Sequence, residues 1–105
     1  MNELTLGNGS VIQVAEHDFA NQFDWATAIL MCQEMGDGWR LPTIYETEHI
    51  FENSVLFHFA NYGYWTYRTS EEINSEQAFG FTDEGTINEA LKTESFYIRA
   101  VRTIV

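Results

Sequence analysis

The sequence predicts an α+β fold made of two helices and a small, mainly antiparallel sheet. Two observations carry this prediction. Two stretches with helical periodicity follow one another, each preceded by a residue that caps helices well. The rest of the chain alternates short apolar runs with turn residues, which is typical of antiparallel strands. The length of 105 residues suits one domain, so we expect residues 1–105 to form a single unit.

The first predicted helix covers about Trp25–Met35. Asp24 stands before it as a good N-cap, and Gly36 ends it by taking a positive φ at little cost. One helical face carries apolar residues at the spacing i, i+3, i+4 and i+7; these are Trp25, Ala28, Ile29 and Cys32.

A short stretch between the helices has the sequence Gly36-Asp37-Gly38-Trp39-Arg40-Leu41-Pro42-Thr43. Trp39 and Leu41 alternate with Arg40, which predicts a short strand with two apolar side chains on one face. Pro42 should stop that strand and keep Leu41 extended.

Thr43 begins a capping box with Glu46, which predicts a second helix over about Ile44–Asn53. We expect one face of this helix to be wet and the other buried. The wet face carries Tyr45, Glu48, His49 and Glu52, and the buried face carries Ile44, Thr47, Ile50 and Phe51.

Strands are expected on both sides of the helices. A hairpin joins Leu4–Leu6 to Val11–Ala15, and the later strands are Tyr64–Tyr67, Ala78–Thr82, Thr86–Leu91 and Ser95–Val105. Arg68–Glu76 is predicted to be a polar connection, and the apolar loop Ser54–Gly63 is predicted to pack back on the domain.

The chain is strongly acidic, with a formal charge of −11 and only five Lys and Arg residues. Long-range repulsion disfavours nucleic acid and anionic membranes as partners. We interpret the acidity first as a source of solubility. A mimic of DNA, or a protein that docks on a basic partner, is the sharper alternative.

Cys32 is the single cysteine, so no disulfide can form within the chain, which fits a reducing compartment. The first residues lack the features of a signal peptide, and no apolar run has the length of a membrane span. These features favour a cytoplasmic location; a secreted protein whose signal has been removed is the alternative.

Several motifs resemble the Lcl-type C-terminal domain of bacteria, a large family of mostly unknown function with a C-type-lectin-like fold. The most specific are Trp25-x-x-Ala28-x-x-x-Cys32 and Gly36-x-Gly38-Trp39-Arg40-Leu41-Pro42-Thr43-x-x-Glu46. Tyr64-Trp65-Thr66 is similar to the family's Tyr-Trp-Ser segment, and Arg99-Ala100-Val101-Arg102 to its closing Arg-Cys-Val-Arg. Ala100 stands where many members have Cys, so the family's disulfide cannot form here.

The resemblance implies that the first and last strands pair and that both helices flank the sheet. We assign structural roles to Trp25, Cys32, Trp39, Arg40, Leu41, Pro42, Thr43, Glu46, Trp65, Arg99 and Arg102. Carboxylates are the expected partners of Arg40, Arg99 and Arg102, because Arg forms forked pairs with them; Glu46 and Glu48 are near Arg40 in sequence.

Catalysis and metal binding find little support in the sequence. The lectins that this fold resembles bind calcium through a proline-containing loop, and the one proline, Pro42, lies elsewhere. The three histidines are scattered, and none has the spacing of a zinc site with Cys32. Cys32 lies on an apolar helical face, which favours a buried thiol over a nucleophile. We expect no cofactor, no metal and no enzymatic activity.

A binding surface is expected on the open side of the sheet, where ligands of this fold tend to bind. The candidate residues are Tyr64, Tyr67, Arg68, Thr69 and Asn74. Tyrosine and arginine are favoured at interfaces because they bring large contact areas and forked hydrogen bonding. Strand alternation places Tyr64 and Trp65 on opposite faces, with Trp65 in the core, so Arg68 and Tyr64 are the stronger candidates.

The sequence therefore predicts a calcium-independent, non-catalytic binding module for an unknown protein or small ligand. We expect it to be a monomer or a weak homodimer. The alternatives are an acidic inhibitor or mimic that docks on a basic partner, and a display domain of a phage or mobile element.

Overall fold

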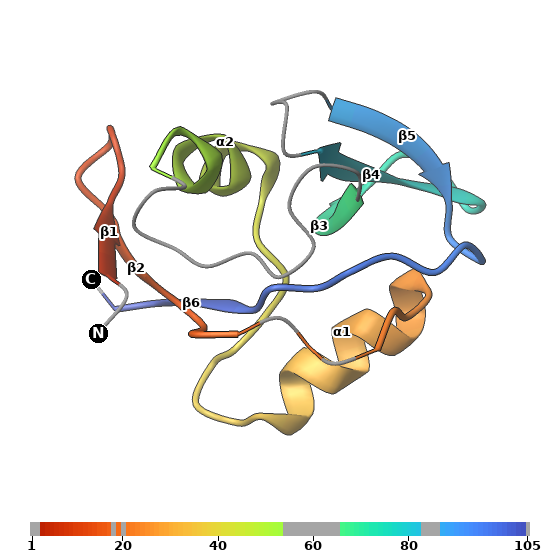
Figure 1. Cartoon of the computed structure of the whole chain (residues 1–105), viewed down its shortest axis with the longest axis horizontal. Coiled ribbons are helices and arrows are strands. Elements are labelled where there is room, and N and C mark those ends of the chain that lie inside the picture. The colour runs from red at the N-terminus through yellow and green to blue at the C-terminus, as the bar shows by residue number, and fades with distance from the viewer. Residues whose placement is uncertain (1–2, 18, 20, 54–65, 83–86, 105) are drawn as a thin grey trace.

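The computed structural model describes residues 3–17, 19, 21–53, 66–82 and 87–104 (Figure 1). Its elements in chain order are β1 (Glu3–Thr5), β2 (Val11–Val14), α1 (Trp25–Glu34), α2 (Ile44–Glu52), β3 (Thr66–Glu72), β4 (Gln77–Thr82), β5 (Ile87–Leu91) and β6 (Val101–Thr103). The strands form two antiparallel sheets of three strands each, in the orders β1-β2-β6 and β3-β4-β5. The α+β class is confirmed, with two small sheets in place of one.

The first sheet is built on the predicted hairpin. Leu4 pairs with Ile12 across β1 and β2, and Val14 pairs with Val101 across β2 and β6. The implied pairing with the last strand is made by Val11–Val14 of the hairpin, because β6 pairs with β2; the first strand, β1, takes the outer edge instead. β1 occupies one edge of β2, and β6 pairs with the other edge. The inner face of this sheet packs in a cluster of Leu4, Leu6, Ile12, Val14, Ile50 and Val101.

Both helices begin and end close to the predicted residues. The Asp24 side chain accepts from the Thr27 N–H at the start of α1, and Gly36 follows the helix with φ of 72°. At the start of α2, Thr43 and Glu46 form both hydrogen bonds of the capping box. On α1, Ala28 and Cys32 pack against a cluster completed by Leu41, Ile98 and Ala100. None of the helices in the described part of the chain is long and apolar enough to cross a membrane.

The second sheet extends further than the sequence predicted. Residues expected to form a polar connection instead continue β3 to Glu72, which pairs with Ala78 across an irregularity that begins after Arg68. A bulge of this kind lets a strand with polar residues stay paired while it bends. The remaining turn is closed by Asn74, whose Oδ1 accepts from the N–H groups of Glu76 and Gln77.

Two other predicted strands are shorter than expected. Over Trp39–Leu41 there is a single bridge, between Arg40 and Val101, because Pro42 has no N–H with which to extend the pairing. The predicted strand Ser95–Val105 pairs with four different segments: isolated bridges join Phe96 to Phe23, Tyr97 to Tyr67 and Val101 to Arg40, and β6 pairs with β2. A stretch that changes partner this often cannot remain one regular strand.

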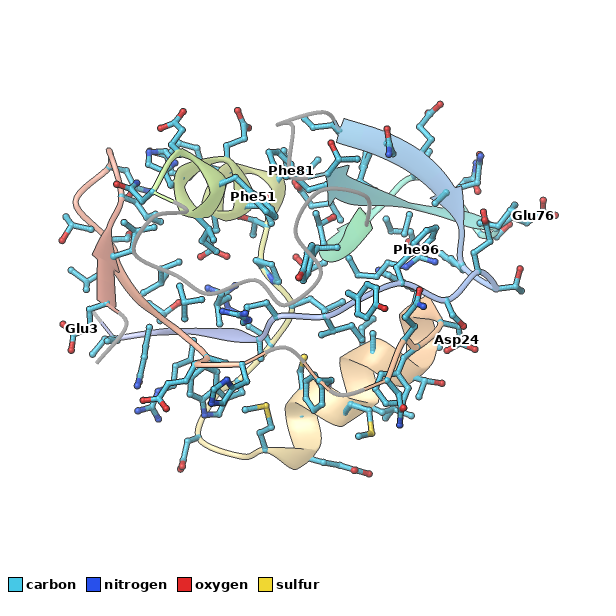
Figure 2. The ribbon with its side chains drawn as sticks, in the orientation of Figure 1. Glu3, Asp24, Phe51, Glu76, Phe81 and Phe96 are labelled. Atoms are coloured by element: carbon cyan, nitrogen blue, oxygen red, sulfur yellow. The ribbon has the colours of Figure 1, made fainter. Side chains whose placement is uncertain are left out.

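The helices lie on opposite sides of the C-terminal segment, with α2 at the top and α1 at the bottom of Figure 1. Phe51 of α2 stacks on Phe81 of β4, with 4.8 Å between ring centroids and 13° between ring planes (Figure 2). The apolar loop Ser54–Gly63 and the residues Tyr64 and Trp65 lie outside the described residues, so the predictions made for them remain predictions.

Two isoleucines test where the core lies. Ile98 is fully buried in the cluster against α1, whereas Ile87 on β5 is 42% exposed. We expect Ile98→Ala to lower the free energy of unfolding by about 2–5 kcal/mol, because it removes buried methylenes and leaves a cavity. Ile87→Ala should change it by less than about 0.5 kcal/mol. Urea denaturation of both variants is the measurement, and equal losses would contradict this packing.

Candidate functional site

The structure buries most of the predicted binding surface. Tyr67 is 2% exposed, and Arg68 and Thr69 are both fully buried. The expectation that these three residues form an open surface is therefore wrong. Asn74 is exposed, but its side chain closes the turn after β3, and Tyr64 lies outside the described residues. The four candidate residues that the structure describes consequently do not gather into one accessible site.

Three separate segments converge on the middle of β3 and cover it. The Arg68 N–H donates to the Tyr97 carbonyl at 3.1 Å, and the Ser70 N–H donates to the Pro42 carbonyl at 2.8 Å. From α1, the Trp25 indole N–H donates to the Thr69 carbonyl at 3.0 Å. β3 is thus an internal joint that holds α1, the segment between the helices and the C-terminal segment together.

The Arg68 side chain is buried, and none of the described carboxylates forms an ion pair with it. Its Nη2 donates to the carbonyls of Leu91 at 2.6 Å and Glu94 at 2.8 Å, and its guanidinium carbon lies 4.6 Å from the centroid of the Phe96 ring. Burial lowers the pKa of Arg68, while the charges of Glu94 and Asp24 oppose this shift. The side chain fastens the turn after β5 to β3, so its role is structural.

Arg40 joins the end of the chain to α2. Its Nη1 and Nη2 donate to the two carboxylate oxygens of Glu46 at 2.7 and 2.8 Å, and Nη2 also donates to the Thr103 hydroxyl. Glu46 is 6% exposed and accepts from the Thr43 N–H as well. Burial acts to raise the pKa of Glu46, but the hydrogen bonds from Arg40 and Thr43 outweigh it and hold that pKa below its usual value.

Arg99 and Arg102, the two C-terminal arginines, were also expected to pair with carboxylates. Arg99 is 3% exposed and donates to the Ala15 carbonyl at 3.1 Å. Arg102 donates to the side-chain oxygen of Gln13, and its guanidinium carbon lies 5.0 Å from a ring centroid of Trp39. A carboxylate partner is confirmed for Arg40. For Arg102, within the part of the chain described, the expected carboxylate is replaced by an amide oxygen and an aromatic ring.

Cys32 is a free, fully buried thiol, as predicted. Burial raises its pKa to about 11, so the thiol stays protonated at neutral pH. A protonated buried thiol is a poor nucleophile, because the thiolate is the reactive form. Among the described residues, no three His, Cys, Asp or Glu side chains are grouped so that they could hold a metal ion.

A small hollow lies between α2 and β3. Its lining residues are Pro42, Thr47, Ile50, Phe51, Tyr67 and Arg99. Nearly all of this described lining is apolar or aromatic, and Arg99 is the charged side chain in it. An apolar lining of this kind is typical of the space left between packed secondary-structure elements.

A different exposed surface lies on β5, and the sequence analysis missed it. Ile87 and Leu91 are 42% and 46% exposed, and Glu89 between them is exposed too. Alternation places these three side chains on one face of the strand and Asn88 and Ala90 on the other. The alternation along β5 could have revealed this face from the sequence. However, the face that carries Ile87 and Leu91 is the more apolar of the two, and an apolar strand face is ordinarily assigned to the core. Comparison with protein-family models and with curated proteins finds no match to the chain.

The Arg40–Glu46 pair predicts a pH dependence of stability. Because the pKa of Glu46 is lowered by folding, its ionised form stabilises the native state above the pKa of the unfolded chain. That contribution is lost as the pH falls through the folded-state value. We expect Glu46→Gln to cost about 1–3 kcal/mol at neutral pH and progressively less in acid.

Chemical denaturation from neutral pH down to about pH 3 measures this difference, since ordinary glutamates titrate near pH 4.3. Glu48→Gln is the matched control, because Glu48 is exposed on the same helix. A cost for Glu46→Gln that is the same at every pH would show that the charge of Glu46 does not stabilise the fold.

Proposed function

We propose that this chain is a non-catalytic binding module with a C-type-lectin-like fold, similar to the Lcl-type C-terminal domain, and that it binds without calcium. The observation that carries the proposal is the exposed face of β5. Two large apolar side chains, Ile87 and Leu91, stand in water beside an exposed carboxylate, Glu89. Apolar groups grouped on one surface and rimmed by polar groups are typical of interaction sites.

The structural roles of the buried polar side chains also support the proposal of a non-catalytic binding module. Arg40, Glu46 and Arg68 hold segments of the fold together through hydrogen bonds to one another or to backbone carbonyls. The thiol of Cys32 is kept protonated by burial. Titratable groups with shifted pKa values often mark catalytic sites, but packing and structural hydrogen bonds account for the shifts of these four and for that of Asp24, the N-cap of α1.

A more specific form of the proposal is an acidic protein that docks on a basic partner. The formal charge of −11 favours it, because a field of this size attracts cationic surfaces and raises association rates. Exposed carboxylates also lie on β5, at Glu89, and beside it, at Glu76 and Glu94. Steep weakening of binding with salt would distinguish this form from recognition of a neutral ligand.

The test is a binding screen in calcium and in chelator. The protein is applied to one array of peptides with graded net charge and to one array of glycans. We expect saturable binding on the peptide array, strongest for cationic peptides and equal in both conditions, because the described residues contain no group of three His, Cys, Asp or Glu side chains that could hold a metal ion. Calcium-dependent binding, or the absence of saturable binding on both arrays, would contradict the proposed function.

A further inference from the structure

We propose that the free edge of β5 accepts an extended, basic segment of a partner protein as an added strand. This inference rests on the proposed function and specifies its site and partner. β5 is the outer strand of its sheet, and among the described residues no strand pairs with the side that faces away from β4. Figure 1 shows β5 as a long arrow at the periphery of the domain, away from β1, β2 and β6.

The register of β4 and β5 shows which backbone groups are available. The Lys92 N–H donates to the Glu76 carbonyl, and Leu91 is opposite Gln77 in the ladder. In an antiparallel pair, hydrogen-bonded and non-bonded positions alternate. Ala90 and Asn88 therefore point their backbone groups toward β4, whereas Ile87, Glu89 and Leu91 point theirs outward.

Leu91 sets the end of this available edge. Its N–H already donates to Oε1 of Glu94, and its carbonyl accepts from Nη2 of Arg68. The outward N–H and C=O groups of Glu89 and Ile87 are not used by any strand in the described part of the chain and are available to a partner strand. An added strand would thus form its hydrogen bonds at these two residues, as peptides do when they extend an exposed sheet edge.

The side chains on the same strand define what the added strand should contain. Ile87, Glu89 and Leu91 share one face at intervals of two residues. Residues opposite one another in neighbouring strands interact most strongly when they are apolar pairs or opposite charges. The complementary strand therefore carries apolar, basic and apolar residues at alternate positions, with the basic residue opposite Glu89.

The charges near β5 favour this occupant over a second copy of the chain. Glu76 and Glu94 are exposed beside the strand, and the nearby base, Lys92, is paired with Glu72 and lies over the Trp25 ring. Two copies joined symmetrically through β5 about Glu89 would place their Glu89 side chains directly opposite each other. Like charges in that position are destabilising, and the net charge of −11 on each copy adds to the repulsion.

The probe is a short peptide, capped at both ends, with the sequence Thr-Val-Thr-Lys-Thr-Val-Thr. Paired antiparallel to β5 and centred on Glu89, it places lysine opposite Glu89, where the lysine backbone N–H would donate to the Glu89 carbonyl. Two matched peptides isolate the two parts of the proposal: one has Glu in place of Lys, and the other is N-methylated on the lysine backbone nitrogen. Amide chemical-shift changes on titration into labelled protein report both affinity and location.

We expect the shifts to centre on β5 and the affinity to fall severalfold between about 0.05 and about 0.3 M salt. The glutamate peptide and the N-methylated peptide should each bind at least about tenfold more weakly, since one loses the charge pair and the other a ladder hydrogen bond. Equal binding of the N-methylated peptide, shifts centred on another element, or no binding by the lysine peptide would overturn the proposal.

Two variants at one position provide the matched test within the protein. Glu89→Pro removes an outward N–H that none of the described strands uses, and proline is tolerated at such edge positions. It should abolish binding, whereas Glu89→Gln should retain weaker binding with a shallower salt dependence. If Glu89→Pro does not fold, the N-methylated peptide decides the question alone.

The outcomes separate this inference from the proposed function. If Glu89→Pro binds the lysine peptide as well as the parent does, the chain still binds peptides and only the edge of β5 is excluded. If the lysine peptide does not bind but the arrays yield another saturable ligand, the proposed function stands and this inference fails. Self-association through β5 without any peptide would identify a second copy as the occupant and overturn the proposal.

Discussion

The fold depends on a reciprocal backbone contact between Arg40 and Val101. The Arg40 N–H donates to the Val101 carbonyl at 2.8 Å, and the Val101 N–H donates to the Arg40 carbonyl at 2.9 Å. The Arg40 side chain also donates hydrogen bonds to Glu46 of α2 and Thr103 of β6. One residue between the helices therefore fixes α2, the C-terminal strand and, through Leu41, the packing against α1.

The second sheet depends on small side chains that leave room for a large one. Arg68 is directly opposite Gly80, and Ala78 and Ala90 lie on the same face of the sheet. Little side-chain volume on that face lets the Arg68 side chain cross toward the carbonyl of Leu91. The larger side chains of β5 consequently project from the opposite face. The burial of Arg68 and the exposure of the apolar face of β5 are thus two results of one packing arrangement.

Local signals predicted the helices well because each is encoded by neighbouring residues. Asp24, Gly36 and the Thr43–Glu46 capping box set helix ends without help from distant segments. The binding surface was placed incorrectly because burial of Arg68 depends on Tyr97 and Leu91, which are far away in sequence. An arginine among threonines and serines ordinarily indicates exposure, and nothing local shows that backbone carbonyls will receive it.

Native-state hydrogen exchange at the amides of Arg40 and Val101 tests the central role of this contact most directly. If the contact holds the fold together, both amides should exchange only through global unfolding, with opening free energies equal to the value from denaturation. Exchange through a local opening of much lower free energy, while the amides of Ile12 and Phe81 stay protected, would show that the two sheets and α2 remain assembled without it.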